Sequence, residues 1–252
     1  GLLDPDRPYA KGWINHRMKT YNYRNIDLLQ YNQIKDKNIK YLEMFSYNGQ
    51  VEQDKFVLKM LDFKKDGYFL ELGSQHPINN NNSYLLEKDY NWTGIMVEMD
   101  KKWSKHYEEH RKKSKHKICN ALSIDFKDLL KDSPKNIDYL QVDLEPSNMS
   151  TINVLTNIDK VMDTYKFAVV TLEHDKYRGN FNNTVERSRE IFKQNGYKLV
   201  FQNIQDDTGY ACPFEDWYVH PDLVSNNYVE EVINKNKINY ENGNINYKRI
   251  EY

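Results

Sequence analysis

Strand-length apolar runs alternate with helix-length segments over most of the chain, and this alternation restricts the fold more than any other feature. The runs predicted as strands cover 68–72, 94–98, 115–119, 137–144, 167–173, 197–204 and 215–220. Helical patterns separate all but the last two, which are joined by about ten residues without such a pattern. The sequence therefore predicts an α/β fold with a mostly parallel seven-stranded sheet, helices on both faces and an antiparallel edge strand.

The chain divides by composition into three segments. Residues 1–50 are polar with short apolar pairs, and we expect an N-terminal appendage that is a candidate lid. Residues 51–223 carry the alternating pattern and are the predicted core, and residues 224–252 are a predicted polar C-terminal tail. The chain begins without Met, which suggests a domain of a larger multidomain protein.

Charge and cysteine content limit the classes of partner. The 36 Lys and Arg residues nearly balance the 37 Asp and Glu residues, so the net charge is −1 and nucleic acid is not expected as a partner. Cys119 and Cys212 are the two cysteines, too few for a disulfide framework or a zinc-ligand pattern. No apolar run approaches the roughly 20 residues of a membrane span, and residues 1–30 lack a signal peptide. A cytoplasmic location is therefore predicted.

Acidic residues gather at the predicted strand ends. In an open parallel sheet, ligands bind outside the carboxyl ends of the strands, so these positions are the first candidates for a site. The strand-end residues are Glu71-Leu72-Gly73, Glu98, Cys119-Asn120-Ala121, Asp143-Leu144-Glu145 and Glu173-His174-Asp175. One acid could be a helix cap, but acids at four of five ends indicate a binding function.

The loop after the first strand distinguishes two nucleotide-like cofactors. A dinucleotide needs several glycines so that the backbone can approach its pyrophosphate, whereas only Gly73 is present and His76-Pro77 would crowd that group. S-adenosylmethionine has no phosphate and needs one close backbone approach, an acid for its ribose and a polar group for its adenine. Gly73, Glu98 and Asn120 match these three needs. The loop therefore favours S-adenosylmethionine.

The order and spacing of these motifs resemble the FkbM-type S-adenosylmethionine-dependent methyltransferases from about Gln53 to Leu223. The matching segments are "EQDKFVL", "GYFLELGS", "NNSYLLEKDYNWTGIMVEMD", "IDYLQVDLEPS", "VVTLEHDKYR" and "FEDWYVHPDLV". The glycine loop is degenerate, and Pro146 stands where the family's Asp-x-Glu-Gly motif has Gly. The resemblance implies a Rossmann-like class I methyltransferase that transfers a methyl group to a hydroxyl, often on a sugar or glycan.

Specific residues are predicted for each role. His174 is the candidate general base because its ordinary pKa lies near neutral pH, and Asp143 is the second catalytic candidate. Asp143, Glu173 and Asp175 could hold Mg²⁺ or Mn²⁺, which prefer oxygen ligands. The predicted cofactor-binding residues are Glu71, Gly73, Ser74, Ser83, Glu98, Met99, Asn120, Ala121 and Asp143. The predicted residues for a carbohydrate acceptor are Tyr177, Arg178, Glu215, Asp216 and Trp217.

Other functions of the same fold class remain open at this level. An O-methyltransferase acting on another small molecule would use the same cofactor site. A nicotinamide-dependent oxidoreductase would need the phosphate-binding loop that is missing here. A methyltransferase for nucleic acid would need a basic cleft, and a non-catalytic binding module with a vestigial pocket would also explain the lost glycines.

Overall fold

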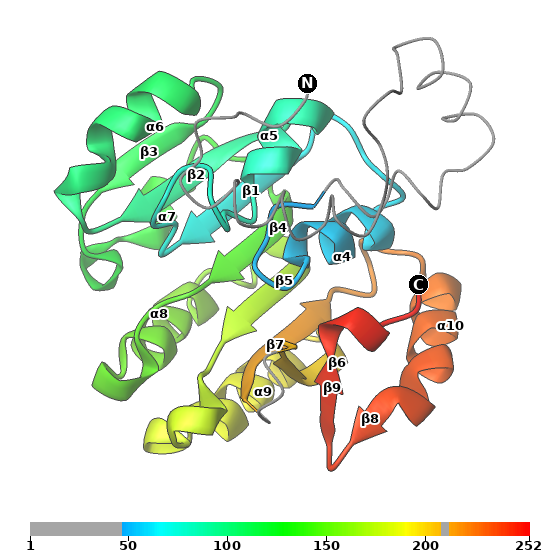
Figure 1. The fold of residues 1–252 in the computed structure, drawn as a ribbon. Helices are drawn as coiled ribbons and strands as arrows, with labels where there is room; N and C mark the ends of the chain where they lie inside the picture. The colour runs from blue at the N-terminus through cyan, green and yellow to red at the C-terminus, as the bar shows by residue number, and fades with distance from the viewer. Residues whose placement is uncertain (1–46, 208–211) are drawn as a thin grey trace, which may run out of the picture. The chain divides into compact units, whose positions relative to one another are not determined.

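The expected alternation of strands and helices is present in the computed structural model, which describes residues 47–207 and 212–252 (Figure 1). All seven predicted strands form, with bounds within a few residues of those expected. The strands are β1 Tyr68–Leu72, β2 Thr93–Glu98, β3 Lys115–Ile118, β4 Asn136–Val142, β5 Lys166–Glu173, β6 Lys198–Gln205, β7 Pro213–Val219, β8 Tyr240–Glu241 and β9 Asn244–Asn246.

The sheet of the described residues has nine strands, in the order β3-β2-β1-β4-β5-β7-β6-β9-β8. Strands β1 to β5 pair in parallel, and β7 pairs antiparallel with both β5 and β6. This is the mostly parallel, Rossmann-like α/β sheet that the sequence predicts. The reversed strand β7 lies between β5 and β6, inside the sheet and not at its edge as predicted. All seven of its residues are accordingly buried.

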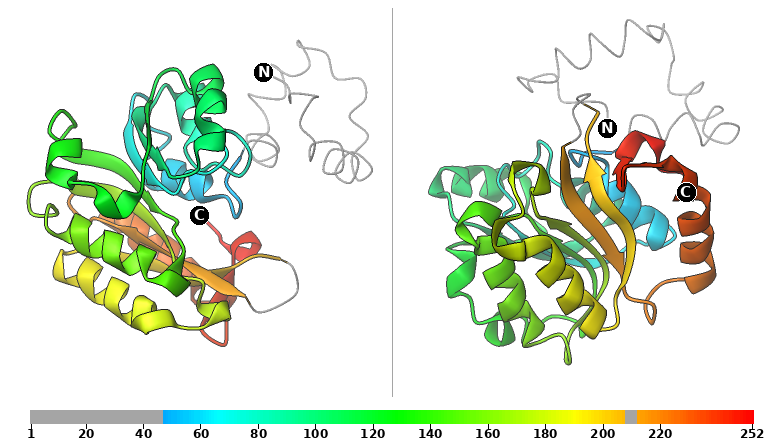
Figure 2. Two further views of the ribbon diagram at one scale, coloured as in Figure 1. Left: turned by 90° about the vertical axis from the view of Figure 1, so that its left-hand side faces the viewer. Right: turned by 90° about the horizontal axis from the view of Figure 1, so that it is seen from below.

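Helices cover both faces of the sheet (Figure 2). One face packs against α4, α5 and α10 through residues such as Phe56, Leu86 and Val229. The other packs against α7 and α8 through Phe126 and Ile152, with α9 alongside. The helices are α4 Gln53–Met60, α5 Tyr84–Tyr90, α6 Ser104–His110, α7 Phe126–Leu129, α8 Ser150–Asp159, α9 Thr184–Gln194 and α10 Asn226–Asn236. The ends of the strands are thereby fixed between two apolar layers.

The C-terminal segment differs from the expected polar tail. Residues 224–252 contain α10 and the strands β8 and β9, and β9 pairs in parallel with β6. Val229, Val232 and Ile245 are buried, and these few apolar side chains at helix and strand spacing attach the segment to the core. The compact unit therefore runs from Tyr47 to Tyr252.

The N-terminal appendage was predicted for residues 1–50, and residues 1–46 of it lie outside the described part of the chain. From residue 47 onward the chain contacts the core, where Gly49 bridges to Asn80. Among the residues that the structure describes, no helix has both the length and the apolar character needed to cross a membrane.

Candidate functional site

Strand register places the strand-end acids on one face of the sheet. Glu71 lies opposite Gln141, Gln141 opposite Thr171, and Thr171 opposite Trp217. Because side chains alternate along a strand, Asp143, Glu173 and Glu215 follow one step further on the same face. Glu173 and Glu215 are direct partners in the β5–β7 register. A row of carboxyl groups therefore runs along this edge of the sheet, and we call Glu71, Asp143, Glu173 and Glu215 the acidic rim.

Gly73 makes the turn at the end of β1, and only glycine fits there. Its φ is +79°, and a Cβ built on it would lie 1.7 Å from the carbonyl oxygen of Asp143. The backbone N–H groups of Gly73 and Ser74 donate to the carbonyl oxygen of Val97, at 3.0 and 3.2 Å. The turn therefore passes directly over the end of β4, where a side chain on residue 73 would collide with the backbone.

Glu71 is fully buried beneath this turn. Its Oε2 accepts hydrogen bonds from Ser83 Oγ at 2.8 Å and from Asn81 Nδ2 at 3.1 Å. Its Oε1 is buried and accepts no hydrogen bond. Burial raises the pKa of Glu71, and the charge of Arg111 opposes that rise. An unpartnered oxygen beside a glycine turn suits a positively charged or hydrogen-bond-donating ligand.

Arg111 fixes the segment after β1 to the end of α6. It is 1% exposed. Its guanidinium donates to Glu87 Oε2 at 3.0 Å, Asn81 Oδ1 at 2.8 Å, Ser83 Oγ at 2.7 Å and Pro77 O at 3.0 Å. Ser83 is therefore part of this internal network and 0% exposed, so its side chain reaches a ligand only through Glu71.

Tyr107 adds a second anchor, four residues before Arg111. Its hydroxyl lies within hydrogen-bond distance of Ser74 Oγ, at 2.6 Å, and of the carbonyl oxygen of Gln75, at 2.8 Å. Ser74 is itself buried. The spacing of Tyr107 and Arg111, one helical turn apart in a run of charged residues, is the signal that could have identified the buried side of this helix.

Glu98 ends β2 close to the same turn. Its Oε2 accepts from the backbone N–H of Gln75 and its Oε1 from that of Asp100, each at 2.7 Å. Each carboxylate oxygen has two lone pairs, so both can accept another bond from a ligand diol. The neighbouring Met99 is 68% exposed. Glu98 is thus held in one orientation while it stays accessible.

Asn120 and Ala121 follow β3. The Asn120 side chain caps a short 3₁₀ turn by accepting from the backbone N–H of Leu122 at 2.9 Å, while Ala121 is buried. Because Asn120 is exposed, its side-chain amide N–H groups face solvent and can contact a ligand. The register aligns the end of β3 with Glu98 at the end of β2.

The centre of the acidic rim holds protons at neutral pH. Burial raises the pKa of Asp143 to about 7, and the charges of Asp175 and Glu71 add to the rise. Burial and the neighbouring Asp143 carboxyl hold the pKa of Glu173 well above its usual range. Burial raises the pKa of Glu215 to about 8, and Gln53 Nε2 donates to its Oε2 at 3.0 Å. Like charges this close cannot all ionise, so a cation bound here would be stabilised.

His174 lies on the other side of the sheet from the acidic rim. It is 0% exposed, and its Nε2 lies 3.3 Å from Asp216 Oδ1. Its Nδ1 accepts from the backbone N–H of Lys176 at 3.2 Å. Both ring nitrogens are therefore engaged inside the protein, which leaves none for the general-base role that the sequence suggested.

Asp216 is buried with His174 and is not at the acceptor side. Its carboxylate accepts from Arg189 Nε at 2.7 Å and from the backbone N–H of Asn203 at 2.7 Å. Although burial alone would raise it, hydrogen bonds and charge from His174 and Arg189 hold the pKa of Asp216 well below its usual range. Asp216 and Glu215 are adjacent in the chain and point to opposite faces, so they serve different parts of the molecule.

The other predicted acceptor residues divide between surface and core. Trp217 is 0% exposed and stacks on Phe56 with 4.7 Å between ring centroids, so it cannot stack on a sugar in this arrangement. Tyr177 is 50% exposed, and its partial burial together with the charge of the nearby Asp175 raises its pKa. Arg178 pairs with Asp175 Oδ2 at 2.8 Å and with Glu145 Oε1 at 3.1 Å.

The predicted metal ligands do not form a site as arranged. Asp143, Glu173 and Asp175 are not among the described groups whose three ligand atoms lie within 4.8 Å of one another. Asp175 Oδ2 accepts a hydrogen bond from Arg178. The pKa values of Asp143 and Glu173 are raised, so these two carboxyl groups retain protons near neutral pH. We therefore derive no step through a metal at these residues.

Comparison with known proteins leaves the family of this chain unassigned. No protein-family model matches the sequence, and no curated protein matches it. Several solved structures match it in fold at low sequence identity. An O-methyltransferase candidate from Klebsiella pneumoniae is 10% identical, with 83% of this chain and 96% of that one covered and a TM-score of 0.49.

Two further structures were solved as methyltransferases. A TehB-like SAM-dependent methyltransferase from Corynebacterium glutamicum is 10% identical, covers 85% of this chain and 100% of its own, and has a TM-score of 0.45. An rRNA methylase from Streptococcus thermophilus is 10% identical, covers 66% and 93%, and has a TM-score of 0.44. The function of this chain therefore has to be inferred from the residues at its strand ends.

Proposed function

We propose that this chain is an S-adenosylmethionine-dependent O-methyltransferase whose acceptor is a hydroxyl of a sugar or glycan. The observation that carries the proposal is the Gly73 turn, which lies above the buried, unpartnered oxygen of Glu71 and lacks the glycines of a phosphate-binding loop. The loop after β1 lacks the glycines that would let its backbone bind the pyrophosphate of a dinucleotide. A phosphate-free donor needs no such loop, and its positive charge matches the carboxyl groups of the acidic rim.

Three parts of the strand edge would hold the donor. The backbone of Gly73 and Ser74 would lie under its methionine part, with the free oxygen of Glu71 close by. Glu98, already oriented by two backbone N–H groups, would accept the two ribose hydroxyls. The exposed amide of Asn120 and the buried Ala121 would border the adenine. S-adenosylmethionine supplies the methyl group as an electrophile on a sulfonium.

The chain's own contribution to the reaction is alignment and proton removal. The chain's residues would hold the acceptor oxygen in line with the methyl carbon and the sulfur of the bound donor, whose sulfonium would leave as a neutral thioether. Positioning of the two reactants supplies much of the rate. We assign Asp143 as the group that takes the hydroxyl proton, because its pKa of about 7 places its charge change near neutral pH.

The acceptor side is proposed from the surface beside Asp143. Tyr177 is the exposed aromatic residue next to Asp175, and an aromatic face there suits the apolar side of a sugar ring. The carboxyls of Glu173 and Glu215 would accept hydrogen bonds from sugar hydroxyls when ionised and donate them when protonated. Both roles are those that a polyhydroxylated acceptor needs.

Calorimetric titration of the full chain with S-adenosylmethionine and, separately, with NAD tests the donor. We expect binding of the first and none of the second. Glu98→Ala should raise the Kd for S-adenosylmethionine on the order of tenfold, because a positioned charged hydrogen-bond acceptor is worth about 1.5–3 kcal/mol. Asp222→Asn is the matched control, since Asp222 is an exposed acid paired with Lys166 at the opposite edge of the sheet. Equal binding by both variants and the unaltered chain would contradict the site.

A methyl-transfer screen over sugars and glycans tests the acceptor. Transfer of radiolabelled methyl to a carbohydrate, unchanged by chelator, is the expected result. Asp143→Asn should lower kcat by about 10²-fold or more while the donor still binds. Transfer only to non-carbohydrate acceptors would refute the acceptor class and leave the donor assignment intact, whereas loss of donor binding would refute both.

A further inference from the structure

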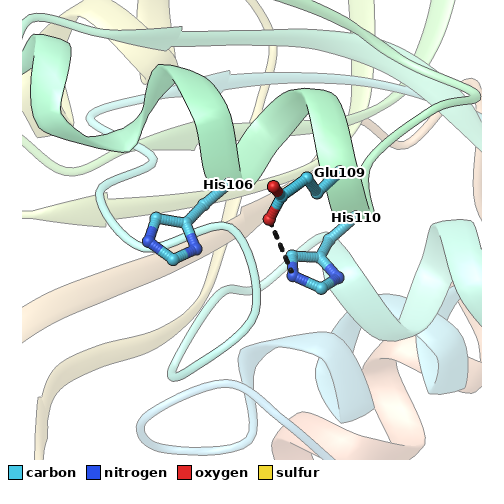
Figure 3. Close-up of side chains that lie close together, drawn as sticks. All are labelled: His106, Glu109 and His110. Carbon is cyan, nitrogen blue, oxygen red and sulfur yellow. Dashed lines mark ion pairs between the residues drawn. The ribbon is translucent and has the colours of Figure 1, made fainter.

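Three metal-ligating side chains lie together on the exposed face of α6, outside the acidic rim. His106, Glu109 and His110 each offer one ligand atom, and these atoms all lie within 4.8 Å of one another (Figure 3). Among the described residues this is the group of three His, Cys, Asp or Glu side chains that meets this condition. Figure 3 shows the Glu109 carboxylate between the two rings.

The helix itself creates the cluster. Residues three and four positions apart lie on one side of a helix, so His106, Glu109 and His110 share a side. Tyr107 and Arg111 occupy the buried side of the same segment, with 0% and 1% exposure. Their hydrogen bonds to the chain after β1 fix the rotation of α6. The cluster therefore points to solvent in a defined orientation.

The interactions present now are weak enough for an ion to replace them. His110 Nε2 lies 3.9 Å from Glu109 Oε2, and Lys105 Nζ lies 3.7 Å from Glu109 Oε1. These side chains are between 43% and 83% exposed, and exposed pairs of this kind contribute between about 0 and 1 kcal/mol. The rings of His106 and His110 are nearly parallel, at 15°, with centroids 6.4 Å apart.

We propose that His106, Glu109 and His110 bind one divalent ion of the zinc class. Imidazole nitrogen selects Zn²⁺, Co²⁺, Ni²⁺ or Cu²⁺ over Mg²⁺ and Ca²⁺. Zinc bonds to nitrogen and to carboxylate oxygen are about 2.0–2.2 Å long, so the three ligand atoms have to approach within roughly 4 Å of one another. Small rotations of exposed side chains provide that approach. Two imidazoles and one carboxylate leave a fourth position for water.

The ion would also restrain the segment that follows β1. The His76 ring contacts the Trp103 ring at 4.8 Å between centroids and the His106 ring at 5.9 Å. His76 Nδ1 accepts from the backbone N–H groups of Ile78 and Asn79, which fixes the ring to its own loop. Fixing His106 with an ion therefore stiffens the contact between α6 and the residues after Gly73.

Spectroscopic and calorimetric titration of the metal-free full chain with Co²⁺ and with Zn²⁺ tests the site. We expect one ion per chain at His106, Glu109 and His110, visible absorption from bound Co²⁺, and a Tm that rises with Zn²⁺ concentration. The double variant His106→Gln with His110→Gln should lose this binding. Glu109→Gln should raise the Kd at least about tenfold, since even residues behind metal ligands have effects of that size.

Two variants serve as matched controls for the titration. Glu108→Gln removes an adjacent exposed acid from the same helix, and His116→Gln removes a histidine that stacks on Tyr107 at 5.4 Å. Both should bind like the unaltered chain. Circular dichroism establishes whether each variant is folded. If the double variant is unfolded, the loss of metal affinity in Glu109→Gln tests the site instead. Equal binding in all variants would refute the site, as would the absence of binding in the unaltered chain.

Discussion

Gly73 sets the geometry of the candidate site because its side chain is a single hydrogen atom. Gly243 has nearly the same φ, +77° against +79°, but a Cβ there would meet nothing within 4 Å. Alanine at either glycine incurs the left-handed backbone cost of about 1–2 kcal/mol. Gly73→Ala must also move the carbonyl oxygen of Asp143, and we expect its loss of unfolding free energy to exceed that of Gly243→Ala clearly.

Urea unfolding of the two alanine variants measures this difference. The Gly243→Ala variant measures the cost of the left-handed backbone conformation alone. Gly73 and Gly243 share that conformation, whereas the steric contact with β4 arises at Gly73 and not at Gly243. The donor-binding affinity should fall only in Gly73→Ala. Equal unfolding free energies would mean that the chain relaxes around the new methyl group without disturbing β4.

His174 is expected to matter for stability and not for proton transfer. Replacing it by Ala removes a fully buried ring and one partner of Asp216, with a loss of about 2–4 kcal/mol of unfolding free energy. Below the lowered Tm, the Kd for S-adenosylmethionine and the pH profile of transfer should be unchanged. A loss of kcat with normal stability would restore His174 as a base.

Sequence reasoning at this scale identified residue types more reliably than their environments. The turn at Gly73 and the position of Glu98 at the end of β2 could be predicted, because strand ends and turns are local features. His174 could not, because its burial depends on Asp216, which is 42 residues away and reaches the same face only through the β5–β7 pairing. Trp217 was misplaced for a related reason: which face of β7 is covered by α4 is decided by tertiary packing.

The buried Arg111, at the C-terminal end of helix α6, connects this helix to its neighbours. Arg111 joins α6 to Glu87 of α5 and to the segment after β1 by four hydrogen bonds to different partners. Arg111→Ala leaves the nearly buried Glu87 without its ion-pair partner, and we expect a loss of about 3–5 kcal/mol of unfolding free energy. Amide hydrogen exchange should accelerate from residue 75 to residue 83, where the network ends.

Arg249→Ala is the control for this experiment. Arg249 pairs with Glu241 on the surface, where it is 53% exposed, and its removal should have an effect of about 0–1 kcal/mol. Similar losses in the two variants would show that burial does not distinguish these arginines. The burial of Arg111 could not be predicted from composition, because a buried Arg and an exposed Lys contribute equally to a charge count.

The whole molecule should be less stable at pH 8 than at pH 5. Burial raises the pKa of Asp54 and Asp143 to about 7 and that of Glu215 to about 8, so the native state holds protons that the unfolded chain has released. Stability falls with pH where the native state binds more protons. The decline begins above the ordinary carboxyl pKa and is complete above the raised values. The pKa of Asp216 is lowered instead, so Asp216 contributes to the pH dependence of stability only at acidic pH.

Glu215→Gln tests that sign. A neutral amide removes one titrating group while it can still accept from Gln53, so the loss of unfolding free energy between pH 5 and 8 should shrink by on the order of 1 kcal/mol or more. Denaturant unfolding at several pH values measures the slope. Glu108→Gln, on an exposed residue, should leave it unchanged. A steeper slope in Glu215→Gln would contradict the assigned direction.

The overall fold was largely predictable because the periodic patterns of strands and helices are visible in short segments of the sequence. The position of β7 between β5 and β6 was not, since the sequence of this strand fits either an inner or an outer place until its neighbours are known. The polar tail predicted for residues 224–252 was wrong because the buried apolar residues of this segment, among them Val229, Val232 and Ile245, are separated by polar ones. Composition averages hide such sparse contacts.

The polar network around Arg111 has one more consequence, for the kinetics of ligand entry. The chain after β1 is already ordered by internal bonds to Asn81, Ser83 and Pro77 before any small molecule arrives. An arriving donor would meet a preformed surface, so little conformational freedom would be lost on association and the encounter rate would be limited mainly by diffusion and orientation.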